Sequence, residues 1–193
     1  MTLSYHQKPI LICQLYDQPE MLQSEKIIMT HTPLACLNEA TGRHFGLIGI
    51  CFSTRPLSAR KGVFELCECL KSNPLTSETP LFVIMEIPHR DIVVEMKRIG
   101  VKFLAIFSAD SSFDKLEKIV KGMQRGETMD NIRLTLSRLC PFLHYYPIDD
   151  QRELITCRAY GNRMVLAGKR LHEVCETDTY LHCEYFLNPR TGS

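Results

Sequence analysis

Four cysteines in the last third of the chain have the residue type and number that a metal centre requires. Their spacing is C-x16-C-x17-C-x7-C, which lacks the CxxC pair of common zinc fingers. Four thiolates gathered by a fold can nevertheless hold tetrahedral zinc or an iron–sulfur cluster, and proline follows the first cysteine, as is frequent at cluster ligands. The sequence therefore predicts a zinc or iron–sulfur site formed by Cys140, Cys157, Cys175 and Cys183.

Other interpretations of these four cysteines stay open. They can be buried structural thiols, with one pair able to form a disulfide, or a reversible thiol switch. His144 and His182 lie near them in sequence and could replace one as a ligand, although a hydrogen-bonded surface histidine is the simpler expectation. The chain has nine cysteines, an odd number, so a framework made only of disulfides is not expected. The remaining five lie in apolar segments and are expected to be small buried hydrophobic residues: Cys13, Cys36, Cys51, Cys67 and Cys69.

A second group of reactive residue types lies in the predicted loop 54–61, which follows an apolar run. Ser53 and Thr54 carry hydroxyl groups, but no base is identifiable beside them, and loop hydroxyls usually bond to the backbone. The loop contains no carboxylate, so we expect no catalytic residue there. Its cations could bind an anion, although a solvated loop is the simpler interpretation: Arg55, Arg60 and Lys61.

Strands and helices alternate through the first 125 residues. Continuous apolar runs predict strands buried on both faces, at residues 9–16, 27–32, 46–53, 81–87 and 102–109. Amphipathic spacing with Pro, Asp or Ser at the starts and Gly at several ends predicts helices at residues 20–26, 33–41, 63–71, 91–100 and 113–123. This alternation predicts an α/β fold, a doubly wound five-stranded parallel sheet of flavodoxin-like order 2-1-3-4-5.

The composition changes after residue 125. A linking helix is expected at residues 126–138, and polar, cysteine-rich sequence follows it. The best strand candidates there are residues 153–159 and 163–167, separated by a turn at Gly161 and Asn162. We therefore expect residues 1–125 to form the sheet domain and residues 126–193 to form the linking helix with a small cysteine-rich α+β module. So small a module buries little apolar surface alone and often needs a metal or disulfide.

The first part of the chain resembles the receiver domain of bacterial response regulators. The resemblance is closest in GVFELCECLKSNPLTSETPLFVI and continues in RIGVKFLAIFSADSSFDKL, which is similar to the receiver's Gly-Ala-x-x-[FY]-Leu segment but one residue shorter. It covers about 60% of the chain, as the span from Pro9 to Met123 shows. The resemblance implies the receiver fold and a role in signal transduction.

The chemistry of a receiver is missing from this sequence. The resemblance implies an acidic pair after the first strand, but Gln14 to Tyr16 stand there, and Asp17 is a lone acid. The phosphoacceptor position falls among Phe52, Ser53 and Thr54, and the hydroxyl position after the fourth strand falls on Met85 or Glu86. The lysine position falls on Ile106, followed by Phe107. Magnesium needs several oxygen ligands, so we expect a pseudo-receiver that is not phosphorylated on aspartate.

Composition excludes several functional classes. The net charge of +1 gives no field that would attract nucleic acid or an anionic membrane, and no apolar run approaches the roughly 20 residues of a membrane span. The N-terminal sequence does not predict a signal peptide, so a cytoplasmic location is expected. Phosphate loops, the G-x-S-x-G elbow and HExxH are absent from the sequence, so we expect no enzyme.

The sequence thus predicts a non-enzymatic regulatory protein. The receiver-like domain is expected to bind a protein partner or a second copy through its fourth and fifth helices and the strand between them, and a homodimer interface is expected at residues 91–100 and 102–109. The cysteine module is expected to bind zinc or an iron–sulfur cluster. The first alternative is an iron–sulfur redox or electron-transfer protein. The second is a nucleic-acid-binding regulator, although the basic residues of the last third are interleaved with acids and no helix-turn-helix pattern is visible.

Overall fold

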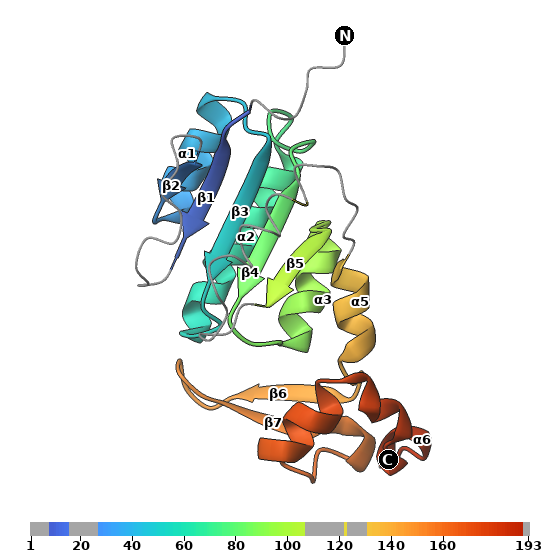
Figure 1. Ribbon diagram of the computed structural model, residues 1–193. Helices are drawn as coiled ribbons and strands as arrows, with labels where there is room; N and C mark the ends of the chain where they lie inside the picture. Colours follow the sequence, from blue (N-terminus) through green and yellow to red (C-terminus); the bar gives the residue numbers. More distant parts are fainter. Residues whose placement is uncertain (1–7, 16–26, 107–121, 123–130, 191–193) are drawn as a thin grey trace.

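A five-stranded parallel sheet forms the larger part of the molecule, and a small cysteine-rich module lies at the carboxyl ends of its strands (Figure 1). The computed structural model describes residues 8–15, 27–106, 122 and 131–190. The predicted helix at 20–26, the start of the linking helix and all of the predicted helix at 113–123 except residue 122 lie outside these ranges. No helix in the described ranges is long and apolar enough to cross a membrane.

The strand order is β2-β1-β3-β4-β5, and every neighbouring pair is parallel. This order confirms the predicted flavodoxin-like sheet. Each strand is two to four residues shorter than its apolar run. The strands are β1 (Ile10–Gln14), β2 (Ile27–Thr30), β3 (Leu47–Phe52), β4 (Leu81–Met85) and β5 (Phe103–Ile106).

The sheet is buried on both faces, as the continuous apolar runs predict. Along β3, Ile48, Ile50 and Phe52 point into one apolar cluster, whereas Leu47 and Cys51 point into a second one. Gly49 also faces the second cluster, because it lies between Leu47 and Cys51 in the alternation of the strand. The larger first cluster contains the buried faces of α1 (Pro33–Gly42), α2 (Leu57–Ser72), α3 (Arg90–Ile99) and α5 (Asn131–Arg138).

Two helices begin earlier than the sequence predicts. Helix α2 starts at Leu57 rather than at residue 63, so the loop after β3 is shorter than the expected 54–61. Helix α3 starts at Arg90, and its N-cap is His89, whose side chain accepts a hydrogen bond from the Ile92 N–H, whereas Asp91 was expected in this role. The C-terminal end of α3 is as predicted, with Gly100 in the left-handed conformation at φ 95°.

The C-terminal module is built on an antiparallel hairpin of β6 (Leu143–Pro147) and β7 (Glu153–Cys157). The expected second strand at 163–167 is reduced to an isolated bridge between Thr156 and Val165, whereas β6, which was not expected, forms the full antiparallel partner of β7. Short helices follow and close over a separate apolar core. They are η2 (Arg158–Tyr160), the π-helix η3 (Arg170–Cys175), η4 (Asp178–His182) and α6 (Glu184–Leu187).

Candidate functional site

The carboxyl ends of the five strands carry few polar side chains among the described residues. In α/β proteins this edge of the sheet usually carries the binding and catalytic residues. Gln14 ends β1, and Ser53 follows β3. The Ser53 hydroxyl donates a hydrogen bond to Glu86 Oε2 (2.9 Å), directly after β4, so one carboxylate does reach the loop. Ile106 ends β5 where a receiver has lysine, while Asp17 and Phe107 lie outside the described residues.

An ion pair joins this edge to the C-terminal module. Arg60 of α2 donates two hydrogen bonds to Glu153 of β7, Nη1 to Oε1 (2.7 Å) and Nη2 to Oε2 (2.6 Å). The two side chains are only 12% and 14% exposed. The Nε of Arg60 also donates to the Thr54 carbonyl oxygen (2.8 Å), which fixes the loop after β3. Two-point contact of a guanidinium with a carboxylate is the strongest ion-pair geometry available to these residue types.

His89 completes this group, which we call the junction triad: Arg60, His89 and Glu153. The Nδ1 of His89 accepts the hydrogen bond that caps α3, so its Nε2 is left to donate, and this atom lies 3.2 Å from Glu153 Oε2. The His89 side chain is 4% exposed. Its ring stacks on Tyr145 of β6, with centroids 3.8 Å apart and an interplanar angle of 20°.

The environment of Glu153 favours its ionised form. Burial by itself raises the pKa of this carboxyl, but the hydrogen bonds from His89 and Arg60, together with the charge of the Arg60 guanidinium, outweigh burial and lower the pKa to about 2. The carboxylate is therefore charged at neutral pH. The triad thus stabilises the contact between the sheet and the module through its ion pair, rather than serving as an acid–base group.

A second contact from the module caps helix α2. The Asp150 carbonyl oxygen accepts from the Leu57 N–H (2.7 Å), and Asp150 Oδ1 accepts from the Ser58 N–H (2.8 Å). The Ser58 hydroxyl donates to Oδ2 of the same carboxylate (3.0 Å). These bonds satisfy amide groups that a helix start leaves open, which explains why α2 begins before its predicted start.

The four predicted ligand cysteines come together in the C-terminal module. Cys140, Cys157 and Cys175 are buried in its core, and Cys183 is half-buried at the start of α6. The Cys140 N–H donates to the Cys175 carbonyl oxygen (2.8 Å). Burial, reinforced by the charges of the other three thiols, raises the pKa of Cys175 to about 12, and burial likewise raises that of Cys140. All four are free thiols.

The arrangement gathers the thiols without forming a coordination shell. Within the described ranges, no group of three or more His, Cys, Asp or Glu side chains is positioned to hold a metal ion. His182 is exposed, and His144 packs its ring edge-on against Tyr146 at 4.2 Å between centroids. The metal role of Cys140, Cys157, Cys175 and Cys183 therefore stays a prediction.

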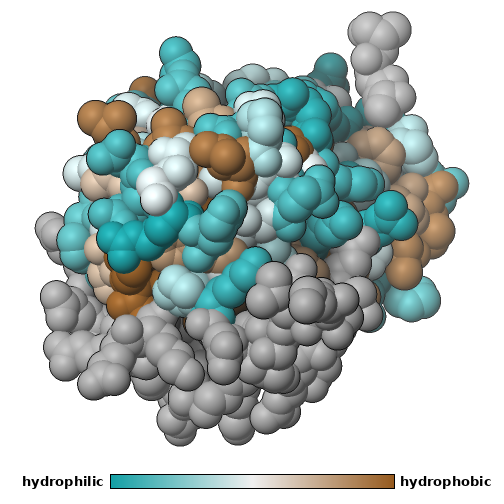
Figure 2. All heavy atoms as spheres, turned by 90° about the horizontal axis from the view of Figure 1, so that it is seen from above, coloured by the Kyte–Doolittle hydropathy of each residue, from teal (hydrophilic) through white to brown (hydrophobic). Residues whose placement is uncertain are grey.

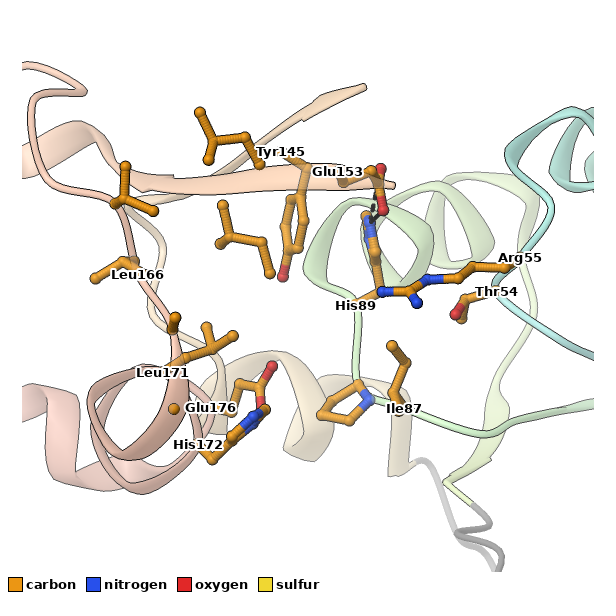
Figure 3. A pocket seen from close by; sticks show the side chains of 16 residues that line it. Thr54, Arg55, Ile87, His89, Tyr145, Glu153, Leu166, Leu171, His172 and Glu176 are labelled. Carbon is orange, nitrogen blue, oxygen red and sulfur yellow. Dashed lines mark hydrogen bonds and ion pairs between the residues drawn. The ribbon is translucent and has the colours of Figure 1, made fainter. Parts of the chain in front are cut away.

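The remaining residues of the predicted loop differ in their surroundings. Arg60 is the half-buried member of the junction triad rather than a solvated cation. Lys61 is exposed and pairs with Glu65 one helical turn away. Arg55 is exposed, and Figure 3 shows its side chain reaching past Thr54 toward His89.

Part of the surface expected to bind a partner is in contact with the chain's own α5. Helix α5 packs against both α3 and β5, and the Ile132 N–H donates to the Lys102 carbonyl oxygen (3.4 Å). At the start of α3, Arg90 Nη1 donates to the Leu139 carbonyl oxygen (2.7 Å). The outer side of α3, including Val94 at 44% exposure, stays open.

Sequence reasoning missed His89, Glu153 and Asp150 as parts of a site. His89 follows Pro88 in what reads as a turn, and the two acids lie in the last third of the chain, more than 60 residues away. One signal was available. If the predicted helix at 63–71 is extended toward its N-terminus, Arg60 falls on the same face as Val63 and Cys67, and a cation on a buried face requires a partner.

Comparisons with known proteins give structural neighbours only. No family model matches the chain, and no curated protein matches it. The chemotaxis response regulator CheY4 of Vibrio cholerae is 14% identical, with a TM-score of 0.48 over 59% of this chain and 96% of that chain. The phosphorylated cyanobacterial phytochrome response regulator RcpA is 17% identical, with a TM-score of 0.47 over 61% and 91%. A sensor protein from Polaromonas sp. JS666 is 18% identical, with a TM-score of 0.45 over 65% and 98%. The flavodoxin-like fold of this chain rests on its own strand order and parallel pairing, and no family is assigned by these comparisons.

Proposed function

We propose that this chain is a non-enzymatic regulatory protein of the cytoplasm, a pseudo-receiver that signals without phosphorylation and carries a four-thiolate metal module. The observation that carries the proposal is the convergence of Cys140, Cys157, Cys175 and Cys183 in one module that the junction triad fastens to the carboxyl edge of the sheet. Metal or redox state at the thiols would thereby be coupled to the edge where receivers exchange their signal.

Independence from phosphorylation is supported by the chemistry of that edge. A magnesium-dependent phosphoacceptor site needs clustered carboxylates and a cation, whereas the described edge offers Glu86, which already accepts from Ser53. The C-terminal module also approaches the same edge through Glu153 and Asp150. A partner would then respond to the docking of the module rather than to an acyl phosphate.

A metal at the four thiols would stabilise them in the ionised form that their surroundings otherwise disfavour. Thiols buried beside one another resist deprotonation, as the raised pKa of Cys175 shows, and a divalent cation compensates the charge that thiolates would create. The module buries only a small apolar core, and modules of this size commonly gain folding free energy from a metal. Closing the shell requires the thiols to move toward one centre when the ion binds.

Metal analysis of the full-length protein, purified without oxygen, tests the module. We expect stoichiometric zinc, or iron with acid-labile sulfide and a brown colour, and we expect Cys140→Ser and Cys175→Ser to lose it. Cys69→Ser is the matched control, because Cys69 is an exposed thiol of α2 outside the module, and it should keep the metal. Wild-type protein with no more zinc or iron than Cys175→Ser would contradict the module's role.

The same measurement separates the leading function from its alternative. Zinc supports a structural or metal-sensing module, because zinc has no redox chemistry. A cluster that takes up and releases an electron reversibly would instead favour the iron–sulfur electron-transfer protein.

A phosphodonor experiment tests the pseudo-receiver. Incubation with acetyl phosphate and magnesium should leave the mass of the intact protein unchanged, because the described edge supplies no magnesium-binding carboxylate cluster. A receiver protein treated in parallel should gain one hydroxylamine-labile phosphoryl group. The same adduct on this chain would refute the proposal, and its loss in Glu86→Gln would identify the acceptor.

We expect a protein partner to bind at the open side of α3 rather than at the end of the sheet domain that lies opposite the module. Figure 2 views the molecule from the end opposite the module, and its coloured residues, which are those described, show hydrophobic groups scattered among hydrophilic ones. The open side of α3, with Val94 and the charged Lys97 and Arg98, lies beside the contact between α5 and α3. A protein partner bound there would sense how the linking helix is held.

A further inference from the structure

A cavity of about 430 Å³ lies between the carboxyl edge of the sheet and the C-terminal module. One wall comes from the segments after β3 and β4, and the other comes from β6, β7 and η3 (Figure 3). The volume is in the range of small-molecule sites, which occur preferentially between domains. Apolar side chains from both walls line it: Ile87, Pro88, Leu154, Val165, Leu166 and Leu171. Ile87 and Val165 are 46% and 59% exposed, so the apolar lining is open to a ligand.

Two hydrogen-bond donors point into this cavity. Among the described residues, the Arg55 guanidinium makes no hydrogen bond or ion pair, and it extends into the cavity beside His89 (Figure 3). The Tyr145 hydroxyl also points inward, and it accepts a hydrogen bond from the Arg90 N–H (3.2 Å), which leaves its own proton available. Burial raises the pKa of Tyr145, so the phenol stays protonated and can donate.

The other charged groups of the lining are already paired. Glu153 is held by Arg60 and His89 in the junction triad. Glu176 Oε2 lies 2.7 Å from His172 Nδ1. Arg55 is therefore the one charged lining residue without a partner in the described part of the chain.

We propose that this cavity binds a small organic monocarboxylate, whose carboxylate bonds to the Arg55 guanidinium and the Tyr145 hydroxyl and whose apolar body packs against Ile87, Leu154 and Val165. A guanidinium matches a carboxylate in a planar two-point contact, and an apolar wall with few polar groups fixes the rest of such a ligand. The flat, stacked rings of His89 and Tyr145 suit a planar or branched body.

The charges of the lining select this class of ligand over two others. A dianionic phosphate would face the carboxylates of Glu153 and Glu176 with only one unpaired cation to balance it. A cationic ligand would face Arg55 and would find both carboxylates already paired. A monocarboxylate needs one cation and one neutral donor, which is what the cavity offers.

Because the ligand would contact both the sheet domain and the module, it would favour the docked arrangement. A ligand that binds the native state and not the unfolded state raises the stability by RT ln(1 + L/Kd), where L is the free ligand concentration. The proposed ligand site does not depend on a metal at the four thiols. A bound carboxylate would be a second influence, besides the metal, on the contact between the sheet and the module.

Calorimetric titration of the full-length protein with phenylacetate and isovalerate, at millimolar concentrations, tests the proposal. We expect saturable binding of at least one, and weaker or no binding of phenylacetamide, which has the same shape without the charge. Arg55→Gln should lower the carboxylate affinity about tenfold or more, since it removes a charge-assisted contact. Lys61→Gln is the matched control, because it removes one exposed cation of the same region outside the cavity lining, and it should bind as the wild type does.

Several results would overturn the assignment. One is equal affinity for phenylacetate and phenylacetamide, and another is unchanged affinity in Arg55→Gln. Absence of saturable binding by both carboxylates would do the same, as would tighter binding of inorganic phosphate. Val165→Ala provides an independent variant, since it trims an exposed side chain and should weaken phenylacetate binding without affecting the charge contact.

Discussion

Replacing Glu153 with glutamine should lower the free energy of unfolding by about 3 kcal/mol, the lower end of the cost of breaking a buried ion pair by removing one partner. Glutamine keeps the shape of the side chain but leaves the Arg60 guanidinium, which is 12% exposed, without a counter-charge. Urea unfolding followed by circular dichroism measures the effect. Limited proteolysis should cut the C-terminal module of this variant faster than that of the wild type.

A matched control lies in the same hairpin. Asp149 pairs with Arg152 at 2.6 Å, but the side chains are 42% and 70% exposed, so Asp149→Asn should leave the urea midpoint unchanged. If both variants unfold at the wild-type midpoint, the junction triad does not hold the module to the sheet.

The pH dependence of stability gives a second readout of the same substitution. The pKa of Glu153 is lowered from its ordinary value of 4.5 to about 2 in the folded protein, so its contribution is present above pH 4.5 and is lost as the pH falls toward 2. Wild-type stability should decline more steeply than that of Glu153→Gln between these values. Parallel curves for the two proteins would show that the carboxylate is not preferentially ionised by folding.

A double-mutant cycle at Gly49 and Phe82 should show strong coupling in the sheet. A Cβ at residue 49 would lie 2.5 Å from Phe82 Cε1 and 2.7 Å from Ile12 Cδ1, which is closer than real packing allows. Gly49→Ala should therefore cost about 1–3 kcal/mol by overpacking. Phe82, which is 0% exposed, should cost about 3–5 kcal/mol on truncation to alanine. In the double variant, the added methyl group enters the space that the ring has left, so the loss should be less than the sum.

Phe52→Ala is the control for this cycle. Phe52 is 1% exposed but belongs to the cluster on the opposite face of the sheet. The effect of Phe52→Ala should add to that of Gly49→Ala, since Phe52 lies on the opposite face of the sheet from the Phe82 ring that crowds residue 49. Additive effects for Gly49 and Phe82 would mean that the ring does not occupy the space above residue 49.

The strands could be predicted from the sequence because each is a continuous apolar run in which both faces are buried. β1, β3 and β4 have every residue buried, and this pattern needs no tertiary information. The start of α2 could not be predicted, because its cap comes from Asp150, which is 92 residues after Ser58. In the module, β6 contains the exposed Tyr146 and ends in Pro147, so its alternation was too weak to favour it over residues 163–167.

Of the candidate site, too, one part could be predicted from the sequence and another part could not. The four cysteines were visible as a set by residue type, and the fold brings them into one core. The junction triad was not visible, because Arg60, His89 and Glu153 come from three separate segments that meet only after the module folds back. From the sequence, each of these three residues taken alone is expected to be an exposed polar side chain.

The cap that Asp150 places on α2 has a consequence for how the chain can be divided. The sheet domain depends on the module at this corner, because the first turn of α2 receives its capping hydrogen bonds from the hairpin of the module. Undocking the hairpin would return the Leu57 and Ser58 amide groups to water and lengthen the loop after β3 toward the form that the sequence alone predicts. A segment of about one helical turn would therefore interconvert between coil and helix, and this transition would carry the state of the C-terminal module to the surface around Ser53.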